Sequence, residues 1–373
     1  MAIVASCSTN KLQYPEAPAD NTVDDYFGVQ VADPYRPLEN DTSAATLKWV
    51  EEERALTESY LSKIPFRKDI RERLKTLYDY KKPGMPSKKD GWYYFYENDG
   101  LQNQSVLYRT RSLDDKPEVF LDPNKLSDDG TVALTGISTS NDGKYTAYTI
   151  SRSGSDWTEI YVMDTETKEL LPDHIEWAKF TDAAWQGDGF YYSAYDKPVD
   201  GKEFSHANEN HRVYYHKIGT PQSDDKLVYE DKDHPLHFHS ASVPDDESAL
   251  IIYGGGEGLG SSITMKSLKD PNAKWVTVEP SQDYDISILD IIDGTMYIYT
   301  NYGAPRYRLM TASVKAPQRE NWKELVPEGE GVLSGVNFAG DKLILTYDID
   351  ASNRLYVYSV SYTHLTLPTI YSV

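Results

Sequence analysis

From Gly91 onward the chain alternates short runs of aromatic and β-branched residues with turns rich in Gly, Asp, Asn and Pro. Such runs predict β-strands, and Asn141-Asp142-Gly143-Lys144 between two of them predicts a hairpin turn. The strands fall into sets that recur at a spacing of about 40 to 55 residues. The recurrence limits the possible folds more than any single motif does, because each unit is too small to bury its own faces.

A repeat of antiparallel sheets most economically forms a β-propeller, in which each sheet packs its faces against its neighbours. Two stacked β-sandwiches are the alternative, but they do not explain the constant unit length. The 30 tyrosines suit propeller strands, because the ring packs between sheets while the hydroxyl reaches a turn or water. We therefore expect a mostly β chain, with five complete sets of strands and most of a sixth.

Two amphipathic helices are predicted ahead of the strands, from Ser43 to Ile64 and from Phe66 to Leu77, with Pro65 between them. Their apolar positions are Trp49, Leu56, Tyr60 and Ile64 in the first helix and Phe66, Ile70, Leu74 and Leu77 in the second. Such stripes need a partner, and nothing later in the chain predicts another helical layer. The helices are therefore expected to belong to a domain that lies mostly elsewhere.

Charge argues against several partners. The chain has 38 Lys and Arg against 59 Asp and Glu, a formal net charge of −21, which repels nucleic acid and anionic membranes. The acidic residues are scattered in short pairs such as Asp24-Asp25 and Asp245-Asp246, typical of turns and solvated surface. No stretch reaches the roughly 18 apolar residues that span a bilayer, so no membrane span is expected.

Cys7 is the single cysteine, which excludes an internal disulfide and a cysteine cluster for zinc. Ile3-Val4-Ala5-Ser6-Cys7, followed by Ser8-Thr9-Asn10, resembles the end of a bacterial lipoprotein signal. Residues 1–10 are interpreted as the remnant of such a signal, with lipidation at Cys7 and a periplasmic or cell-envelope location. The alternatives are a chance apolar run at a frayed terminus and a cytoplasmic location.

Two early segments resemble the opening signature of the prolyl oligopeptidases, in which a similar run precedes two helices: Asp25-Tyr26-Phe27-Gly28 and Asp33-Pro34-Tyr35-Arg36-Pro37-Leu38-Glu39-Asn40. Further segments resemble that family in the same order along the chain. They are 101–108, 120–124, 126–131, 153–157, 213–220 and 299–307. The resemblance extends over residues 14 to 358.

This resemblance implies an α/β-hydrolase domain capped by a seven-bladed β-propeller. Residues 11–80 would be a helical segment of the hydrolase domain, and 81–360 would be about six of the seven blades. The implied activity is that of a serine endopeptidase that cleaves short peptides after proline with a Ser-His-Asp triad, while the propeller controls access. The implied partners are short proline-containing peptides and a C-terminal hydrolase domain, and no cofactor is implied.

The chain departs from that family in one decisive respect. The nucleophile of an α/β-hydrolase sits in a Gly-x-Ser-x-Gly elbow, and this sequence contains no such string. No catalytic residue is therefore expected in this chain, which is predicted to be inactive alone. Ser361 to Thr369 matches nothing expected, so residues 361–373 are interpreted as a non-native tail. A stand-alone propeller that binds peptides or proteins is the alternative function, and a dipeptidyl or oligopeptidase-B-like specificity stays open.

Phe180 is the one candidate substrate contact. Ala178-Lys179-Phe180-Thr181 before Ala184-Trp185 resembles the blade from which a family phenylalanine reaches the peptide's distal pocket. Phe180 would supply apolar contact. The alternative is a core aromatic between blades.

Three other patterns are set aside. His234, His237 and His239 could suggest zinc, with His237 and His239 on one face of a strand, but the sequence identifies no third ligand and no metal site is expected. The glycine run 254–260 lacks the Gly-Lys-Ser/Thr of a phosphate loop and predicts a loose hairpin. Asp348 and Asp350 could pair as in glycosidases, but such pairs are expected by chance among 59 acids.

Overall fold

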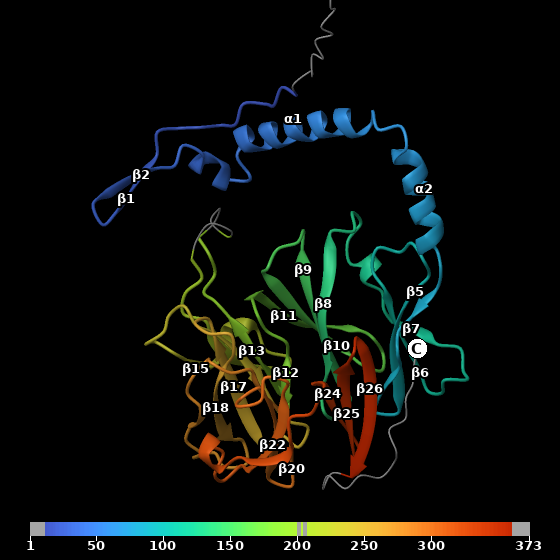
Figure 1. Cartoon of the computed structure of the whole chain (residues 1–373), viewed down its shortest axis with the longest axis vertical. Helices are drawn as coiled ribbons and strands as arrows, with labels where there is room; N and C mark the ends of the chain where they lie inside the picture. Colours follow the sequence, from blue (N-terminus) through green and yellow to red (C-terminus); the bar gives the residue numbers. More distant parts are fainter. Residues whose placement is uncertain (1–11, 200–202, 204–206, 360–373) are drawn as a thin grey trace, which may run out of the picture. The chain divides into compact units, whose positions relative to one another are not determined.

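The computed structural model describes residues 12–199, 203 and 207–359 (Figure 1). The chain divides into two units, one formed by 1–85, 96–105 and 197–207 and the other by 86–95, 106–196 and 208–373. Cys7 and the predicted tail 361–373 lie outside the described residues, so the predictions made for them stay predictions. Among the helices that the structure does describe, none is both long enough and apolar enough to cross a membrane.

The first unit begins with a β-hairpin made of β1 (Val23–Tyr26) and β2 (Val29–Ala32). Its two turn residues, Phe27 and Gly28, have φ of 55° and 89°, the left-handed pair that matches the twist of a tight hairpin. Arg36 opens a 3-10 helix (Arg36–Glu39) and forms ion pairs with Asp24 of β1 and, at 2.6 Å, with Asp33. The segment that resembles the family signature is thus a hairpin tied down by one arginine.

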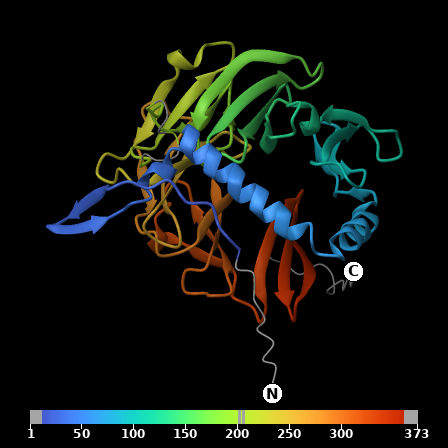
Figure 2. The ribbon, with the colours of Figure 1, turned by 90° about the horizontal axis from the view of Figure 1, so that it is seen from above.

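Two helices follow, α1 (Ala44–Leu61) and α2 (Arg67–Tyr78), seen in blue in Figure 2. The hydroxyl of Ser43 accepts a hydrogen bond from the Thr46 N–H at 3.2 Å and caps α1, as a serine at this position is expected to do. Both predicted helices are confirmed to within a few residues. The apolar stripe predicted on α2 is about half exposed along its length, at Phe66, Ile70, Leu74 and Leu77.

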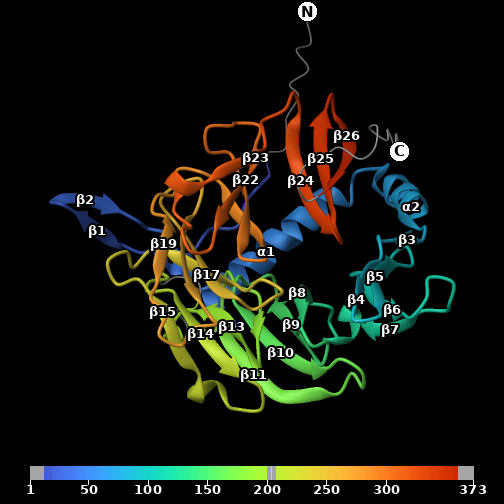
Figure 3. The same ribbon diagram turned by 90° about the horizontal axis from the view of Figure 1, so that it is seen from below.

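Six sets of antiparallel strands lie among the described residues from 82 to 359 (Figures 1 and 3). The first set has β3 (Lys82–Pro83), β4 (Ser87–Lys89), β5 (Trp92–Asn98), β6 (Val106–Thr110) and β7 (Glu118–Leu121). The second has β8 (Val132–Thr139), β9 (Tyr145–Arg152), β10 (Thr158–Asp164) and β11 (Leu170–Ala178). The third has β12 (Ala184–Gln186), β13 (Gly189–Ala194), β14 (Arg212–Lys217) and β15 (Lys226–Glu230). One bridge between Ala178 and Ala194 joins the second and third sets into a continuous sheet.

The last three sets are separate sheets. They are β16 (Phe238–Ser242), β17 (Ala249–Gly255), β18 (Ser262–Ser267) and β19 (Val276–Glu279); then β20 (Ile286–Ile292), β21 (Thr295–Thr300), β22 (Arg308–Ser313) and β23 (Lys323–Val326); and finally β24 (Val332–Ala339), β25 (Lys342–Ile349) and β26 (Ser352–Ser359). In the first set β3 and β4 both pair with β5, and each of the other sets is a meander in chain order. The predicted strand sets are confirmed, the last with three strands.

Strand β17 shows how successive sheets are held together. Side chains on a strand alternate between its two faces. Leu250 and Ile252 pack in one core with Tyr191 and Val213 of the third set, whereas Ile251 lies in another core shared with the β20–β23 sheet. Because the sheet is buried on both faces, the fold is propeller-like and the stacked-sandwich alternative is wrong.

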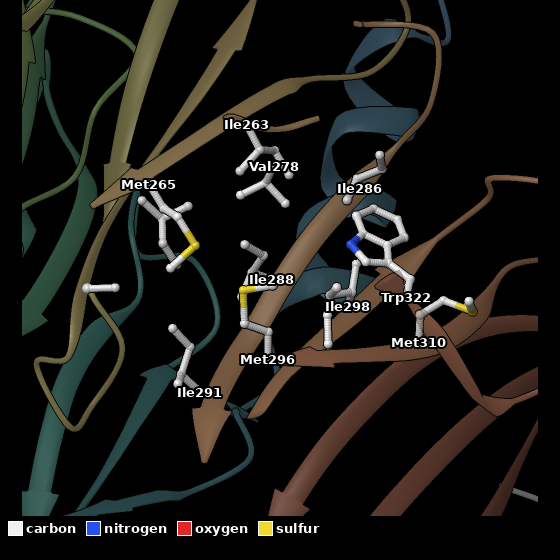
Figure 4. Close-up of a cluster of buried hydrophobic side chains, with 13 residues drawn as sticks. Ile263, Met265, Val278, Ile286, Ile288, Ile291, Met296, Ile298, Met310 and Trp322 are labelled. Carbon is white, nitrogen blue, oxygen red and sulfur yellow. The ribbon is translucent and has the colours of Figure 1, made fainter. Parts of the chain in front are cut away.

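Among the described residues, the largest hydrophobic core lies between the β16–β19 and β20–β23 sheets (Figure 4). Its aliphatic members come from both sheets, and Trp322 closes one side of it. The labelled side chains are Ile263, Met265, Val278, Ile286, Ile288, Ile291, Met296, Ile298, Met310 and Trp322. The Trp322 indole N–H donates to the Pro317 carbonyl at 2.9 Å, so the ring is buried without an unpaired donor.

The glycine run 254–260 includes the turn between β17 and β18, so a hairpin is confirmed at this position. It is not loose. Gly260 N–H donates to the Gln282 carbonyl at 2.8 Å, and a Cβ on Gly260 would lie 1.7 Å from the Tyr284 carbonyl oxygen. A Cβ on Gly258 would lie 2.0 Å from the Gln282 carbonyl oxygen. Glycine is needed here because two backbones touch.

Candidate functional site

The turn between β11 and β12 presents Phe180 at the surface of the second unit. Phe180 has φ of 52° and its side chain is 51% exposed. A bulky residue in this left-handed region is strained, and such strain persists where the surroundings enforce it, often at binding sites. The ring packs against Phe238 at the start of β16, with centroids 5.4 Å apart. The structure therefore places Phe180 in an exposed aromatic pair and not in the core between blades.

A buried histidine holds the Phe180 turn in place. His211 lies just before β14, and its Nε2–H donates to the Lys179 carbonyl at 3.0 Å. Its Nδ1 accepts from the His239 N–H at 2.8 Å. Burial lowers the pKa of His211 to about 3, so the imidazole is neutral at pH 7, as an accepting Nδ1 requires. His211 thereby connects the Phe180 turn to β16.

Lys179 adds a positive charge beside the aromatic pair. Its ammonium lies 4.8 Å from the centre of the Trp157 ring and 5.4 Å from that of Phe180. It also forms an ion pair with the carboxylate of Asp156, at 3.7 Å. A largely buried cation over aromatic faces is stabilised by their π electrons. The turn can therefore offer an apolar surface next to a fixed cation, which suits contact with a peptide more than it suits bond cleavage.

Of the three histidines that the sequence grouped together, His239 lies apart from the other two. His239 is buried, and its Nδ1–H donates to the His211 carbonyl at 3.2 Å. His237 directly precedes β16, which begins at Phe238. His237 and His239 are both buried while Phe238 between them is exposed, the alternation expected of two residues on one face. The ring of His237 stacks on that of His234, with centroids 4.6 Å apart, and Asp231 lies beside them.

Asp348 and Asp350 are exposed residues at the end of β25 and in the turn before β26. Asp350 has φ of 51°, as turn residues of this type often do. Their placement accounts for both acids as parts of a hairpin.

Sequence reasoning singled out Phe180 as a candidate but not His211, Lys179 and Phe238, which the structure places around it. The roles of these three depend on contacts between segments far apart in the chain, such as His211 with Lys179 and Phe180 with Phe238. Only Lys179 could have been found from the local sequence, because a lysine next to an aromatic residue can form a cation–π contact with it.

The comparisons with known proteins agree with one another. The family model described as the N-terminal β-propeller domain of prolyl oligopeptidase matches residues 14–373. The prolyl endopeptidase of Elizabethkingia miricola is 38% identical over 358 residues, which is 96% of this chain and 50% of that protein. Prolyl oligopeptidase A of Amanita bisporigera is 33% identical, over 96% of this chain and 52% of its own length.

Among solved structures, the fold is similar to prolyl oligopeptidase B of Galerina marginata bound to a 35mer hydrolysis and macrocyclization substrate. The TM-score is 0.82 at 29% sequence identity, over 95% of this chain and 54% of that one. The chain thus spans about half the length of the curated relatives it matches.

Proposed function

The chain belongs to the prolyl oligopeptidase N-terminal β-propeller family, and we propose that it is the propeller half of a serine endopeptidase that cleaves short peptides after proline. The observation that carries this proposal is the family match over residues 14–373, in a chain that aligns with half of the Elizabethkingia miricola prolyl endopeptidase. The sequence segments that resemble this family in the same order along the chain support the same assignment.

The chemistry is proposed to reside in a partner domain, an α/β-hydrolase with a Ser-His-Asp triad. The sequence of this chain contains no Gly-x-Ser-x-Gly elbow, so the chain alone is proposed to be inactive. The half-exposed stripe on α2, including Ile70 and Leu74, supports such a partner, because an amphipathic helix in a folded protein normally covers its apolar face.

Within the propeller, Phe180 is proposed to contact the peptide some distance from the cleaved bond. Its exposure, its pairing with Phe238 and its left-handed backbone support this role. The propeller is also proposed to control substrate access. Control of access is supported by a pocket that residues from the first strands of three successive sheets line. Ser242, Ile288 and Asn337 are among the lining residues.

The location of the protein is proposed from Cys7, which would carry a lipid and hold the protein at the cell envelope or in the periplasm. Labelling cells that express the gene with an alkyne-modified fatty acid would test it. Label on the wild type and none on Cys7→Ser would support the proposal. An unlabelled wild type would overturn it in favour of the cytoplasmic alternative, and equal label on both proteins would show that Cys7 does not carry the lipid.

A chimera tests the main proposal. Residues 14–359 replace the matching half of the Elizabethkingia miricola enzyme, and the chimera and the 373-residue chain are each incubated with a fluorogenic proline-containing peptide. We expect cleavage by the chimera only. The stand-alone binding propeller would be supported by two results together. The chimera would be folded but inactive, and the 373-residue chain would bind the peptide tightly without cleaving it.

A further inference from the structure

Three side chains that can bind metal converge beside the Phe180 turn. Asp231 follows β15, and His234 and His237 lie in the segment that leads to β16. One ligand atom from each lies within 4.8 Å of the others. His234 Nδ1 is 2.9 Å from Asp231 Oδ2. His237 is almost entirely buried, whereas His234 is half exposed and can turn toward an ion.

A fourth group comes from a different hairpin. Glu257, in the loop between β17 and β18, brings its Oε1 to 3.2 Å from His237 Nε2. The amide nitrogen of Gln282 lies 3.4 Å from both ring nitrogens of the same imidazole. A second carboxylate therefore lies beside the group of Asp231, His234 and His237, in contact with His237. The combined charge of the four side chains is negative when the imidazoles are neutral.

We propose that Asp231, His234, His237 and Glu257 form a binding site for a divalent transition-metal ion, with Zn²⁺ as its expected occupant. Zinc takes four nitrogen, oxygen or sulfur ligands at about 2.0 to 2.2 Å, which places neighbouring ligand atoms about 3.3 Å apart in a tetrahedron. The distances of 2.9 and 3.2 Å between the histidine and carboxylate atoms are close to that spacing. Imidazole ligands favour zinc, copper or nickel over calcium and magnesium.

An ordinary histidine–carboxylate pair in the same unit shows what distinguishes this cluster. His174 Nε2 lies 2.9 Å from a Glu159 oxygen and stacks on Tyr161. Neither residue belongs to the converging group of metal-binding side chains. The proposed site has in addition a second imidazole and a second carboxylate, and this extra pair is what metal coordination requires.

The position of the site suggests what the ion would do. It would connect the segment before β16 with the β17–β18 loop, and His237 immediately precedes Phe238, the partner of Phe180. A bound ion would therefore stabilise the segment that carries the aromatic pair. This site goes beyond the proposed peptidase function and does not depend on it, because binding is measurable in a chain without catalytic activity.

Zinc titration of the EDTA-treated 373-residue chain tests the proposal, with a chromogenic chelator as competitor. We expect one high-affinity ion per chain, and affinity lower by about 10-fold or more in His234→Ala, His237→Ala, Asp231→Asn and Glu257→Gln. His174→Ala is the matched control and should bind zinc like the wild type. Circular dichroism checks that each variant is folded, and His234→Ala, a change at an exposed position, keeps the test valid if His237→Ala fails to fold.

Cobalt provides a second measurement. Co²⁺ in the wild type should give the intense visible absorption of a four-coordinate site, which His234→Ala should lose. The proposal is overturned if the wild type takes up less than one zinc ion per chain, if His234→Ala binds as tightly as the wild type, or if His174→Ala loses as much affinity as the proposed ligands do.

Discussion

At the scale of single residues, the Phe180 turn depends on one neutral histidine. His211 can accept from the His239 N–H and donate to the Lys179 carbonyl only in its uncharged form. Burial keeps it uncharged by lowering its pKa to about 3. The turn should therefore keep its geometry across the neutral pH range, and a change in peptide binding there must come from other groups.

Phe180→Ala should weaken peptide contact without unfolding the protein. In the active chimera we expect kcat/KM for a proline-containing peptide to fall about tenfold, equivalent to about 1.4 kcal/mol of lost apolar contact. Steady-state kinetics with a short peptide measures it. Phe27→Ala is the matched control, since Phe27 is also an exposed phenylalanine with positive φ. Equal effects of the two substitutions would argue against a specific role for Phe180.

His216 is a second residue whose charge matters, and here the surroundings favour the charged form. Its ring is buried between Asp225, 2.7 Å from Nδ1, and Asp173, 3.0 Å from Nε2. Burial alone would lower the pKa of His216, but the hydrogen bonds and charges of the two carboxylates outweigh burial and raise that pKa. Both ring nitrogens donate only in the imidazolium form.

The sign of the pH dependence follows from the raised pKa. The folded state holds the proton of His216 more tightly than the unfolded chain, whose histidine pKa is about 6.5. The stabilisation of the fold by charged His216 is complete below about pH 6.5 and is lost as the pH rises through the folded-state pKa. Urea unfolding at pH 6 and pH 9 should show a larger drop in unfolding free energy for the wild type than for His216→Gln. His216→Ala should cost about 3–5 kcal/mol at pH 6.

At the scale of elements, sequence patterns predicted most of what formed. The helices α1 and α2 were predictable because a capping serine, a proline and a 3.6-residue apolar period act locally. The strands were predictable from their composition and turns. The tight packing of the glycine run 254–260 was not, because the reason for it lies in Gln282 and Tyr284 of the neighbouring sheet.

Gly260→Ala should destabilise the protein by about 3 kcal/mol, because its Cβ would collide with the Tyr284 carbonyl oxygen. Gly187→Ala is the comparison. Gly187 has φ of 57° and open space around it, so its substitution should cost only the strain of a left-handed alanine, about 1 kcal/mol. Denaturant unfolding of both variants measures the difference. Equal losses would show that the two backbones can move apart.

The apolar stripe of α2 should matter only when the partner domain is present. Leu74→Ser removes a side chain that is 48% exposed in this chain, so we expect little change in the unfolding free energy of the isolated chain. In the chimera the same change should cost about 1–2 kcal/mol, because the partner would bury Leu74. Thermal unfolding of both proteins, with the exposed surface change Leu113→Ser as control, measures it.

At the scale of the whole molecule, the spacing of strand sets was the most informative feature. It predicted sheets that are buried on both faces, and cores shared between successive sheets now account for that spacing. Function was predictable only through resemblance, since no residue of this chain carries a recognisable catalytic motif. The contact of Phe180 with Phe238 required the fold, because it joins segments of different strand sets. Asp231, His234 and His237 lie in one segment between β15 and β16, and their convergence depends on how that segment turns.

The central claim is that this chain forms the propeller half of a prolyl endopeptidase. Its most direct test is mass spectrometry of the products that the chimera releases from one short peptide containing a single internal proline. We predict one cleavage, on the carboxyl side of that proline, and no product from the 373-residue chain alone. Cleavage elsewhere in the peptide, or an intact peptide after incubation with a folded chimera, would contradict the claim.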